Sequence, residues 1–317
     1  MVEPWLTVIG LNEDGLAGLN PPAQQALAVL EAADLALVGA VARAAAGRDI
    51  GEALIDQVDH LVFTDSTATG RKVAQQAAGR LIGMTLELGG KNPLYVAADA
   101  HLESAVAGAV RACFSNTGQL CMSIERLLVH EAVADEFLAR FVDAVRELRI
   151  GPGLDYTHDM GSRTNEAQLE RISEHVDDAI ARGARVLVGG VHRTDLGQLF
   201  YEPTVLTDVP ADALCATEET FGPVVAVQRV RDDGEAIRVM NATEYGLNAS
   251  IWTSSLRRGR ELAAQATHQI VAAAGRRVVA AERAAERDRL AGDHRRCRSA
   301  DDGRILVGHP SHDHRVG

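Results

Sequence analysis

Short runs of strand-forming residues alternate with longer amphipathic segments through most of this chain, and this alternation constrains the fold more than any other feature. The longer segments carry apolar residues at helical spacing, which indicates helices with one buried face. Strands that alternate with helices are typical of an α/β fold with a mostly parallel sheet. The predicted strands are 5–10, 61–64, 84–88, 186–188, 224–230 and 249–252, and the predicted helices are 67–78, 101–113, 132–148, 166–182 and 234–240.

The chain divides into four stretches of different character, namely 1–41, 47–86, 87–266 and 267–317. The first predicts a strand, a loop and a helix that opens at Pro21, because proline is tolerated in a first helical turn. The second and third carry the strand and helix alternation. The last contains ten arginines and no lysine. Its first half is compatible with a helix, and its remainder has the composition of a disordered tail.

Composition narrows the classes of function. A formal net charge of −12 argues against a nucleic-acid or membrane-surface partner. The four cysteines, Cys113, Cys121, Cys215 and Cys297, are far apart and lack zinc-type spacing, which fits a reducing cytosol and predicts no metal site. No apolar run reaches the roughly 18 residues that span a bilayer, and Glu3 stands where a signal peptide carries basic residues. We therefore expect a soluble, cytoplasmic protein.

Cys121 closes the run N-T-G-Q-L-C at 116–121 and is the first candidate for chemistry. A thiol acts as a nucleophile only when it ionises near neutral pH. The Gly-Gln turn just before it can expose the sulfur on a loop. The alternative is a small buried core residue, which is the commoner role of a single cysteine.

Glu87 lies in the run L-E-L-G-G-K-N-P at 86–93, at the end of a predicted strand. Flanking leucines suggest apolar surroundings, and desolvation would raise the pKa of this carboxyl toward the range of a general base. The two glycines allow close backbone approach. A structural carboxylate paired with Lys91 is an equally good interpretation of these residues taken alone.

The run F-T-D-S-T-A-T-G at 63–70 indicates a strand, a turn and the start of a helix. Ser66 can cap that helix, and the free backbone N–H groups of its first turn favour a phosphate. An ordinary helix cap explains the same residues without a ligand.

The run E-E-T-F-G-P at 218–223 combines a carboxylate with an aromatic ring. The carboxylate of Glu219 can accept hydrogen bonds from ribose hydroxyls, and Phe221 can pack against a nicotinamide. In isolation this run is better explained as an acidic surface turn before a strand.

Together these four motifs resemble the aldehyde dehydrogenase superfamily. Their order matches, from F-T-x-S through E-L-G-G-K and G-Q-x-C to E-E-x-F-G-P, and so does the spacing between Glu87 and Cys121. Within the superfamily, the run R-A-C-F-S-N-T-G-Q-L-C-M-S-I-E-R at 111–126 is similar to actinobacterial succinate-semialdehyde dehydrogenases. The resemblance covers about 47–264. It implies an α/β catalytic domain with a truncated Rossmann-type cofactor domain.

The resemblance also implies an activity, the oxidation of a small aldehyde, succinate semialdehyde above all, with NAD or NADP. Cys121 would attack the aldehyde carbon to give a hemithioacetal, hydride transfer would leave a thioester, and Glu87 would activate the water that releases the acid. The backbone N–H of Cys121 would be one oxyanion donor. The implied cofactor-binding residues are Ser66 near the pyrophosphate, Gly70, Leu88, Glu219 near the nicotinamide ribose and Phe221 beside the nicotinamide ring.

The sequence also departs from the family pattern. Asp65 occupies a position that is glycine in the family motif, so a carboxylate and a Cβ stand where the pyrophosphate is expected. We expect the upstream half of the cofactor domain to be absent, and with it the asparagine that serves as second oxyanion donor. We also expect the family's final segment, including its oligomerisation strand, to be missing after about residue 264.

A second resemblance concerns the N-terminal stretch. Residues 4–39 resemble the start of a precorrin methyltransferase, through W-L-T-V-I-G followed by E-D-G-L-A-G-L. Asp65 and the missing asparagine favour the alternative to an active dehydrogenase, namely a catalytically dead remnant or a fusion of a dehydrogenase with a methyltransferase fragment. A third hypothesis, a methyltransferase, is supported only by the N-terminal stretch.

Overall fold

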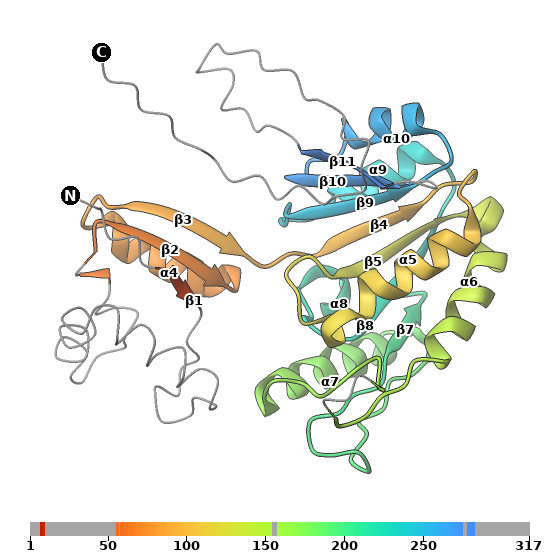
Figure 1. Cartoon of the computed structure of the whole chain (residues 1–317), viewed down its shortest axis with the longest axis horizontal. Helices are drawn as coiled ribbons and strands as arrows, with labels where there is room; N and C mark the ends of the chain where they lie inside the picture. The colour runs from red at the N-terminus through yellow and green to blue at the C-terminus, as the bar shows by residue number, and fades with distance from the viewer. Residues whose placement is uncertain (1–6, 10–54, 57, 154–156, 275–277, 283–317) are drawn as a thin grey trace. The chain divides into compact units, whose positions relative to one another are not determined.

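A computed structural model describes residues 7–9, 55–56, 58–153, 157–274 and 278–282 of the chain. The chain forms two compact units, Met1–Gly89 and Gly90–Gly317 (Figure 1). The helix expected to open at Pro21 and the tail expected beyond residue 283 lie outside the described residues.

The described part of the first unit is a small parallel sheet with a crossover helix between its second and third strands. The sheet has the order β1-β2-β3, and both neighbouring pairs run parallel. Its elements are β1 Thr7–Ile9, β2 His60–Asp65, α4 Thr67–Ala78 and β3 Gly83–Leu88. Ile55, Leu61 and Ala77 form its buried core. The expected strands 5–10, 61–64 and 84–88 and the expected helix 67–78 are thus confirmed to within a few residues.

The second unit is built on an eight-stranded sheet of order β11-β10-β9-β4-β5-β8-β7-β6. The six strands from β10 to β7 are parallel, while β11 and β6 add antiparallel edges. The strands are β4 Asn92–Val96, β5 Ile124–His130, β6 Arg185–Val188, β7 Thr204–Thr207, β8 Val224–Val230, β9 Asn248–Trp252, β10 Ile270–Ala274 and β11 Val278–Glu282.

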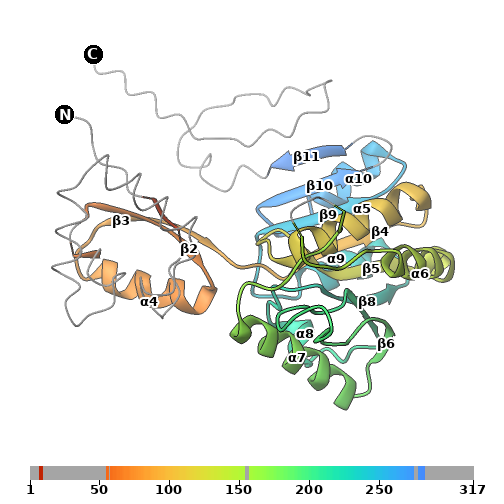
Figure 2. The ribbon, with the colours of Figure 1, turned by 60° about the horizontal axis from the view of Figure 1, so that its bottom comes forward.

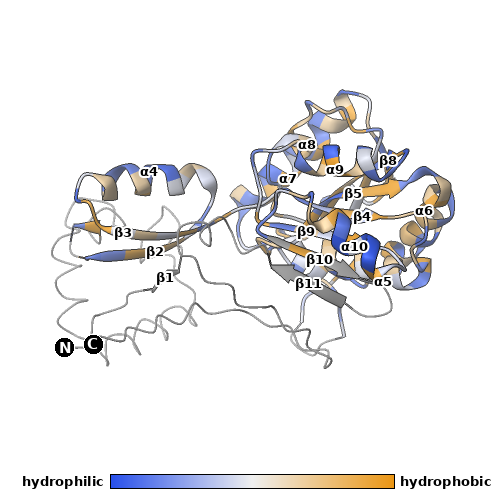
Figure 3. Cartoon of the chain, turned by 90° about the horizontal axis from the view of Figure 1, so that it is seen from above, coloured by the Kyte–Doolittle hydropathy of each residue, from blue (hydrophilic) through white to orange (hydrophobic). Residues whose placement is uncertain are grey.

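Helices cover both faces of this sheet and make a three-layer α/β unit (Figure 2). Side chains alternate along β4, so that Leu94 and Val96 face the cluster under α5 and α6, while Tyr95 and Ala97 face the cluster under α9 and α10. Both faces are therefore apolar, and Figure 3 shows apolar residues along β4 and β5 beside a mostly hydrophilic α10. The helices are α5 Leu102–Phe114, α6 Glu131–Arg146, α7 Glu166–Ala181, α8 Leu214–Thr217, α9 Asp233–Asn241 and α10 Leu256–Ala263.

The predicted α/β class is confirmed, but the helix expected at the start of 267–317 is wrong. Ile270–Ala274 instead forms β10, which pairs with β9, and Val278–Glu282 forms β11. The run I-V-A-A-A is short, and pairing with β9 satisfies its backbone groups as well as a helix would. Within the described residues, none of the helices has the length and hydropathy needed to cross a membrane.

Candidate active site

Two asparagines fix the backbone around Cys121 at the edge of the sheet where the parallel strands begin. Asn92 opens β4, and its Nδ2 donates to the carbonyl oxygens of Cys121 at 2.7 Å and Ser123 at 2.9 Å. Asn248 opens β9. Its N–H donates to Asn92 Oδ1 at 3.1 Å, and its Nδ2 donates to the carbonyl of Met122 at 3.2 Å. Cys121 is therefore held from two neighbouring strands.

The loop that carries Cys121, which we call the nucleophile loop (residues 115–121), is locally strained. Asn116, Thr117 and Gly118 have φ values of 51°, 58° and 69°, which form one left-handed turn. Each non-glycine residue in this conformation costs about 1–2 kcal/mol. Such strain persists where surrounding contacts enforce it, and it concentrates at functional sites.

Cys121 is exposed, whereas Cys113 and Cys215 are buried. Burial raises the pKa of both buried thiols, which keeps them protonated near neutral pH. The neighbours of Cys121, Leu120 and Met122, are also exposed. Among the described cysteines, only Cys121 is exposed, beside the exposed apolar side chains of Leu120 and Met122, as the Gly-Gln turn predicted.

Gln119 of the G-Q-x-C motif ties the nucleophile loop to the segment 161–164. Its Nε2 donates to the carbonyl of Ser162 at 3.2 Å, and its Oε1 accepts from the N–H of Thr164 at 3.1 Å and from the Thr164 hydroxyl at 3.0 Å. Thr117 adds a hydrogen bond from its hydroxyl to the carbonyl of Gly161 at 3.3 Å. The motif glutamine is therefore a support for the loop.

A buried carboxylate shapes the turn that carries Glu219 and Phe221. Glu125 accepts hydrogen bonds from the N–H groups of Thr220 and Phe221, both at 2.8 Å. It also pairs with Lys91, and Lys91 and Glu125 are 1% and 3% exposed. These bonds hold Phe221 at a φ of 53°. Breaking such a buried pair typically costs about 3–5 kcal/mol, so the turn is firmly placed.

Glu219 lies against the first residue of the second unit. Its Oε1 accepts a hydrogen bond from Gly90 N–H at 2.9 Å, and its own carbonyl accepts from Arg171 Nε at 3.1 Å. Burial raises the pKa of Glu219 to about 7, while the Gly90 hydrogen bond opposes that rise. A carboxyl of this kind can both hold and release a proton near neutral pH, and its ionised form can accept hydrogen bonds from hydroxyl groups.

Glu87 lies on β3 in the first unit, and its side chain is exposed. The expectation that Leu86 and Leu88 bury it is wrong, because successive side chains of a strand point to opposite faces. The two leucines are half-buried, and Glu87 is on the other face. Cys121 belongs to the second unit. A shared pocket for the two groups stays a prediction.

The N-terminus of α4, where a phosphate is expected, has the predicted cap at Ser66 and a negative charge at Asp65. Ser66 Oγ caps α4 by accepting from the N–H of Thr69 at 3.3 Å. The carboxylate of Asp65 accepts a hydrogen bond from the N–H of Ser66. A negative charge thus stands at the helix terminus that would face a phosphate.

Gly70 and Leu88 form a close contact between helix and strand. A Cβ at Gly70 would come 2.5 Å from Leu88 Cδ2, so a larger residue at this position would require the Leu88 side chain to move. The structure therefore gives these two predicted cofactor residues a packing role, and their contact with a cofactor stays a prediction.

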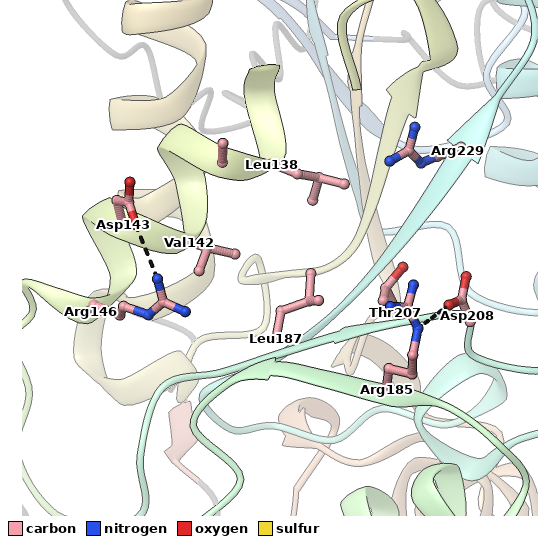
Figure 4. A pocket seen from close by; sticks show the side chains of 10 residues that line it. Leu138, Val142, Asp143, Arg146, Arg185, Leu187, Thr207, Asp208 and Arg229 are labelled. Atoms are coloured by element: carbon pink, nitrogen blue, oxygen red, sulfur yellow. Dashed lines mark hydrogen bonds and ion pairs between the residues drawn. The ribbon is translucent and has the colours of Figure 1, made fainter. Parts of the chain in front are cut away.

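A cavity of about 410 Å³ lies between α6 and strands β6 to β8 (Figure 4). Arg146 and Arg185 line it, but each already pairs with an aspartate, Asp143 and Asp208 respectively. None of the candidate site residues lines this cavity. Among the described residues, there is no group of three or more His, Cys, Asp or Glu side chains that could hold a metal ion.

Several residues that shape the site were not predicted from the sequence to do so. They are Asn92, Lys91, Glu125, Asn248 and Arg163. Asn92 and Lys91 lie inside the E-L-G-G-K-N-P run, and their proximity to Glu87 was the available signal. The others act through backbone atoms of distant segments, which a linear pattern does not display.

Residues 24–283 match the sequence profile of the aldehyde dehydrogenase family. This range includes the expected 47–264 and extends beyond it at both ends. The match begins inside 4–39, whose resemblance to a methyltransferase stays a prediction.

Relatives with assigned names agree with this family. A Mycobacterium bovis protein named as a candidate succinate-semialdehyde dehydrogenase [NADP(+)] 2 is 48% identical over 280 residues, which cover 84% of this chain and 54% of that protein. A similarly named Mycolicibacterium smegmatis protein is 53% identical over 219 residues, covering 69% and 42%. The chain thus spans about half the length of the curated relatives it matches.

Solved structures give the same result. Succinate-semialdehyde dehydrogenase from Burkholderia pseudomallei superposes with a TM-score of 0.68 at 38% identity, covering 71% of this chain and 47% of that one. Betaine aldehyde dehydrogenase from Staphylococcus aureus, in complex with NAD+, superposes with a TM-score of 0.68 at 33% identity, covering 71% and 46%. On its motifs, its fold and these matches, the chain belongs to the aldehyde dehydrogenase family.

Proposed function

We propose that this protein oxidises an aldehyde, with succinate semialdehyde as the expected substrate, to the carboxylic acid with NAD or NADP. The observation that carries the proposal is the exposed Cys121 on a strained loop that Asn92 and Gln119 fix in place. The proposed substrate follows the names of the mycobacterial and Burkholderia relatives. Those names also support NADP, while the betaine aldehyde dehydrogenase complex supports NAD.

The proposed chemistry needs a nucleophile, a hydride acceptor and a base. The Cys121 thiolate adds to the aldehyde carbon, and the backbone N–H of Cys121 stabilises the resulting oxyanion. A bound nicotinamide supplies the hydride acceptor. Loss of hydride from the tetrahedral carbon leaves a thioester on Cys121. Glu87 then removes a proton from water, which attacks the thioester, and the acid leaves as the thiolate is restored.

The cofactor-binding residues divide between the two units. Glu219 and Phe221 would contact the nicotinamide ribose and ring, and the contacts of Glu125 and Arg171 support this by holding their turn in place. Ser66 would lie near the pyrophosphate, with Gly70 and Leu88 packed beneath it. Asp65 opposes that role through its charge. This charge is the specific observation that favours the second candidate, a catalytically inactive member of the family.

Steady-state production of NADPH or NADH from succinate semialdehyde tests the proposal. We expect activity in the unaltered chain and a loss on the order of 10⁴-fold or more in Cys121→Ala, because a covalent nucleophile has no substitute. Cys215→Ala, which removes a buried thiol, is the matched control and retains activity. Equal rates in the unaltered chain and Cys121→Ala would support the inactive alternative.

A further inference from the structure

Arg163 is a buried cation that binds two backbone carbonyls. It is 2% exposed and belongs to the largest fully buried side chains of the described residues. Its Nη1 donates to the carbonyl of Thr117 at 3.1 Å, and its Nη2 donates to the carbonyl of Phe221. Within residues 58–153 and 157–274, the structure gives it no ion pair with a carboxylate, and its Nε has no hydrogen-bond partner.

The two carbonyls belong to the two strained turns of the site. Thr117 lies in the nucleophile loop with a φ of 58°. Phe221, with a φ of 53°, lies in the turn at residues 219–222, which we call the Glu219–Phe221 turn. The turns also touch directly, since a Cβ at Gly118 would overlap the carbonyl of Gly222. Arg163 is therefore the side chain that bonds to both turns where they meet.

A simple core-filling role does not explain an arginine at this place. Burial lowers the pKa of Arg163 to about 10, against the opposing effect of the Glu125 charge, and the guanidinium stays charged at neutral pH. Burying a charge without an ion-pair contact is costly. An apolar side chain would fill the same space without that cost. The guanidinium differs in offering several donors in a fixed planar fork, so it can hold two acceptors at a set separation.

We propose that Arg163 is a positioning residue that couples the nucleophile loop to the Glu219–Phe221 turn. By bonding to both carbonyls it sets the spacing between Cys121 and the side chains expected to face the nicotinamide. The effect on catalysis rests on the proposed function. The coupling of the two turns is independent of that function.

Hydrogen–deuterium exchange tests the coupling without any assay of activity. Arg163→Met removes the donors and keeps a long side chain. We expect amide exchange in 115–121 and in 219–222 to accelerate together, by at least about tenfold. Arg146→Met, which removes an exposed arginine paired with Asp143, is the matched control and leaves both segments unchanged. Unchanged exchange in either segment of Arg163→Met would overturn the proposal.

If Arg163→Met does not fold, Arg163→Lys provides a second test, because lysine keeps a positive charge at this buried position. A single ammonium group does not reproduce the fork, so we expect one or both segments still to exchange faster. Full protection of both segments in Arg163→Lys would contradict the proposal.

Kinetics test the catalytic consequence. We expect kcat per titrated Cys121 to fall on the order of 10²-fold in Arg163→Lys, the loss typical of a misplacement near 1 Å, with KM for the aldehyde nearly unchanged. A change in KM alone would refute the role in positioning. If the unaltered chain shows no activity, the proposed function fails, and the exchange experiment still decides the coupling.

Discussion

Cys121 differs in its exposure to solvent from the other described cysteines, and Glu219 differs in the same way from its neighbour Glu218. Cys121 is exposed, while the two other described cysteines are buried. Glu219 is desolvated, while its neighbour Glu218 pairs with Arg171 at the surface. The exposure of Cys121 was predicted from the turn formed by Gly118 and Gln119 just before it. The raised pKa of Glu219 comes first from its burial and then from the charge of Glu125, against the hydrogen bond from Gly90, and both of these residues are distant in sequence.

The raised pKa of Glu219 predicts a pH-dependent effect on stability. A carboxyl whose folded pKa is about 7, against an ordinary value of 4.5, favours the folded state at low pH, and this contribution is lost as pH rises through about 7. Glu219→Gln removes the titration. We expect it to be more stable than the unaltered chain by up to about 3 kcal/mol at pH 8 and by under about 1 kcal/mol at pH 5.

Urea unfolding at the two pH values measures this difference. Glu218→Gln, on the half-exposed neighbour, is the control and should show no such change between pH 5 and pH 8. A constant stability difference for Glu219→Gln across that range would show that its carboxyl is not desolvated.

The charge of Asp65 predicts weak cofactor affinity. Asp65→Asn keeps an oxygen that can accept from Ser66 N–H and removes the negative charge at the start of α4. We expect NADP+ to bind about 3- to 10-fold more tightly to this variant, the change that one charge at a helix terminus produces. Isothermal titration calorimetry measures it, with Asp59→Asn in the same unit as control. Equal affinity in all three proteins would show that Asp65 does not face the phosphates.

At the scale of elements, the longer amphipathic helices were predicted, whereas the short helix α10 and the fully buried strand β4 were not. Helices α5 to α7 followed from apolar spacing, and their bounds agree within about two residues. Strand β4 was missed because its residues are all buried, so it lacks alternation, and because Pro93 argues against a central strand. A register shift at Asn92 and Pro93 accommodates that proline.

Strand β5 was missed for a different reason. Its run I-E-R-L-L-V-H contains Glu125 and Arg126, whose charges are typical of a surface segment. Both are buried because their partners come from other elements, Lys91 for Glu125 and the carbonyl of Val239 for Arg126. Such compensation is a property of the folded chain and leaves no trace in local composition.

The packing of the nucleophile loop predicts a large effect of a small substitution. Gly118→Ala places a Cβ on a residue with a φ of 69° and into the carbonyl of Gly222. We expect the free energy of unfolding to fall by about 2–4 kcal/mol, from left-handed strain together with overpacking. Gly161→Ala is the matched control, since its Cβ would meet no atom within 4 Å, and it should change stability by under about 0.5 kcal/mol. Comparable losses in the two variants, measured by urea unfolding, would contradict this packing.

At the scale of the whole molecule, the chain has a larger unit built on an eight-stranded sheet and a smaller unit built on a three-stranded sheet. The larger unit holds Cys121, Glu219 and Phe221, and the smaller holds Ser66, Gly70, Glu87 and Leu88. Four short motifs placed in the right order were enough to predict the family, which the comparisons confirm. The joint action of Glu87 and Cys121 in catalysis stays a prediction.

Acid-quenched mass spectrometry of a single turnover tests this joint action most directly. The protein and its Glu87→Gln variant are mixed with succinate semialdehyde and NADP+, quenched and digested. We predict an acyl adduct on the peptide that contains Cys121, persisting on the order of 10²-fold longer in Glu87→Gln because the general base for hydrolysis is gone. An adduct that forms elsewhere or not at all, or one that decays equally fast in both proteins, would contradict the account.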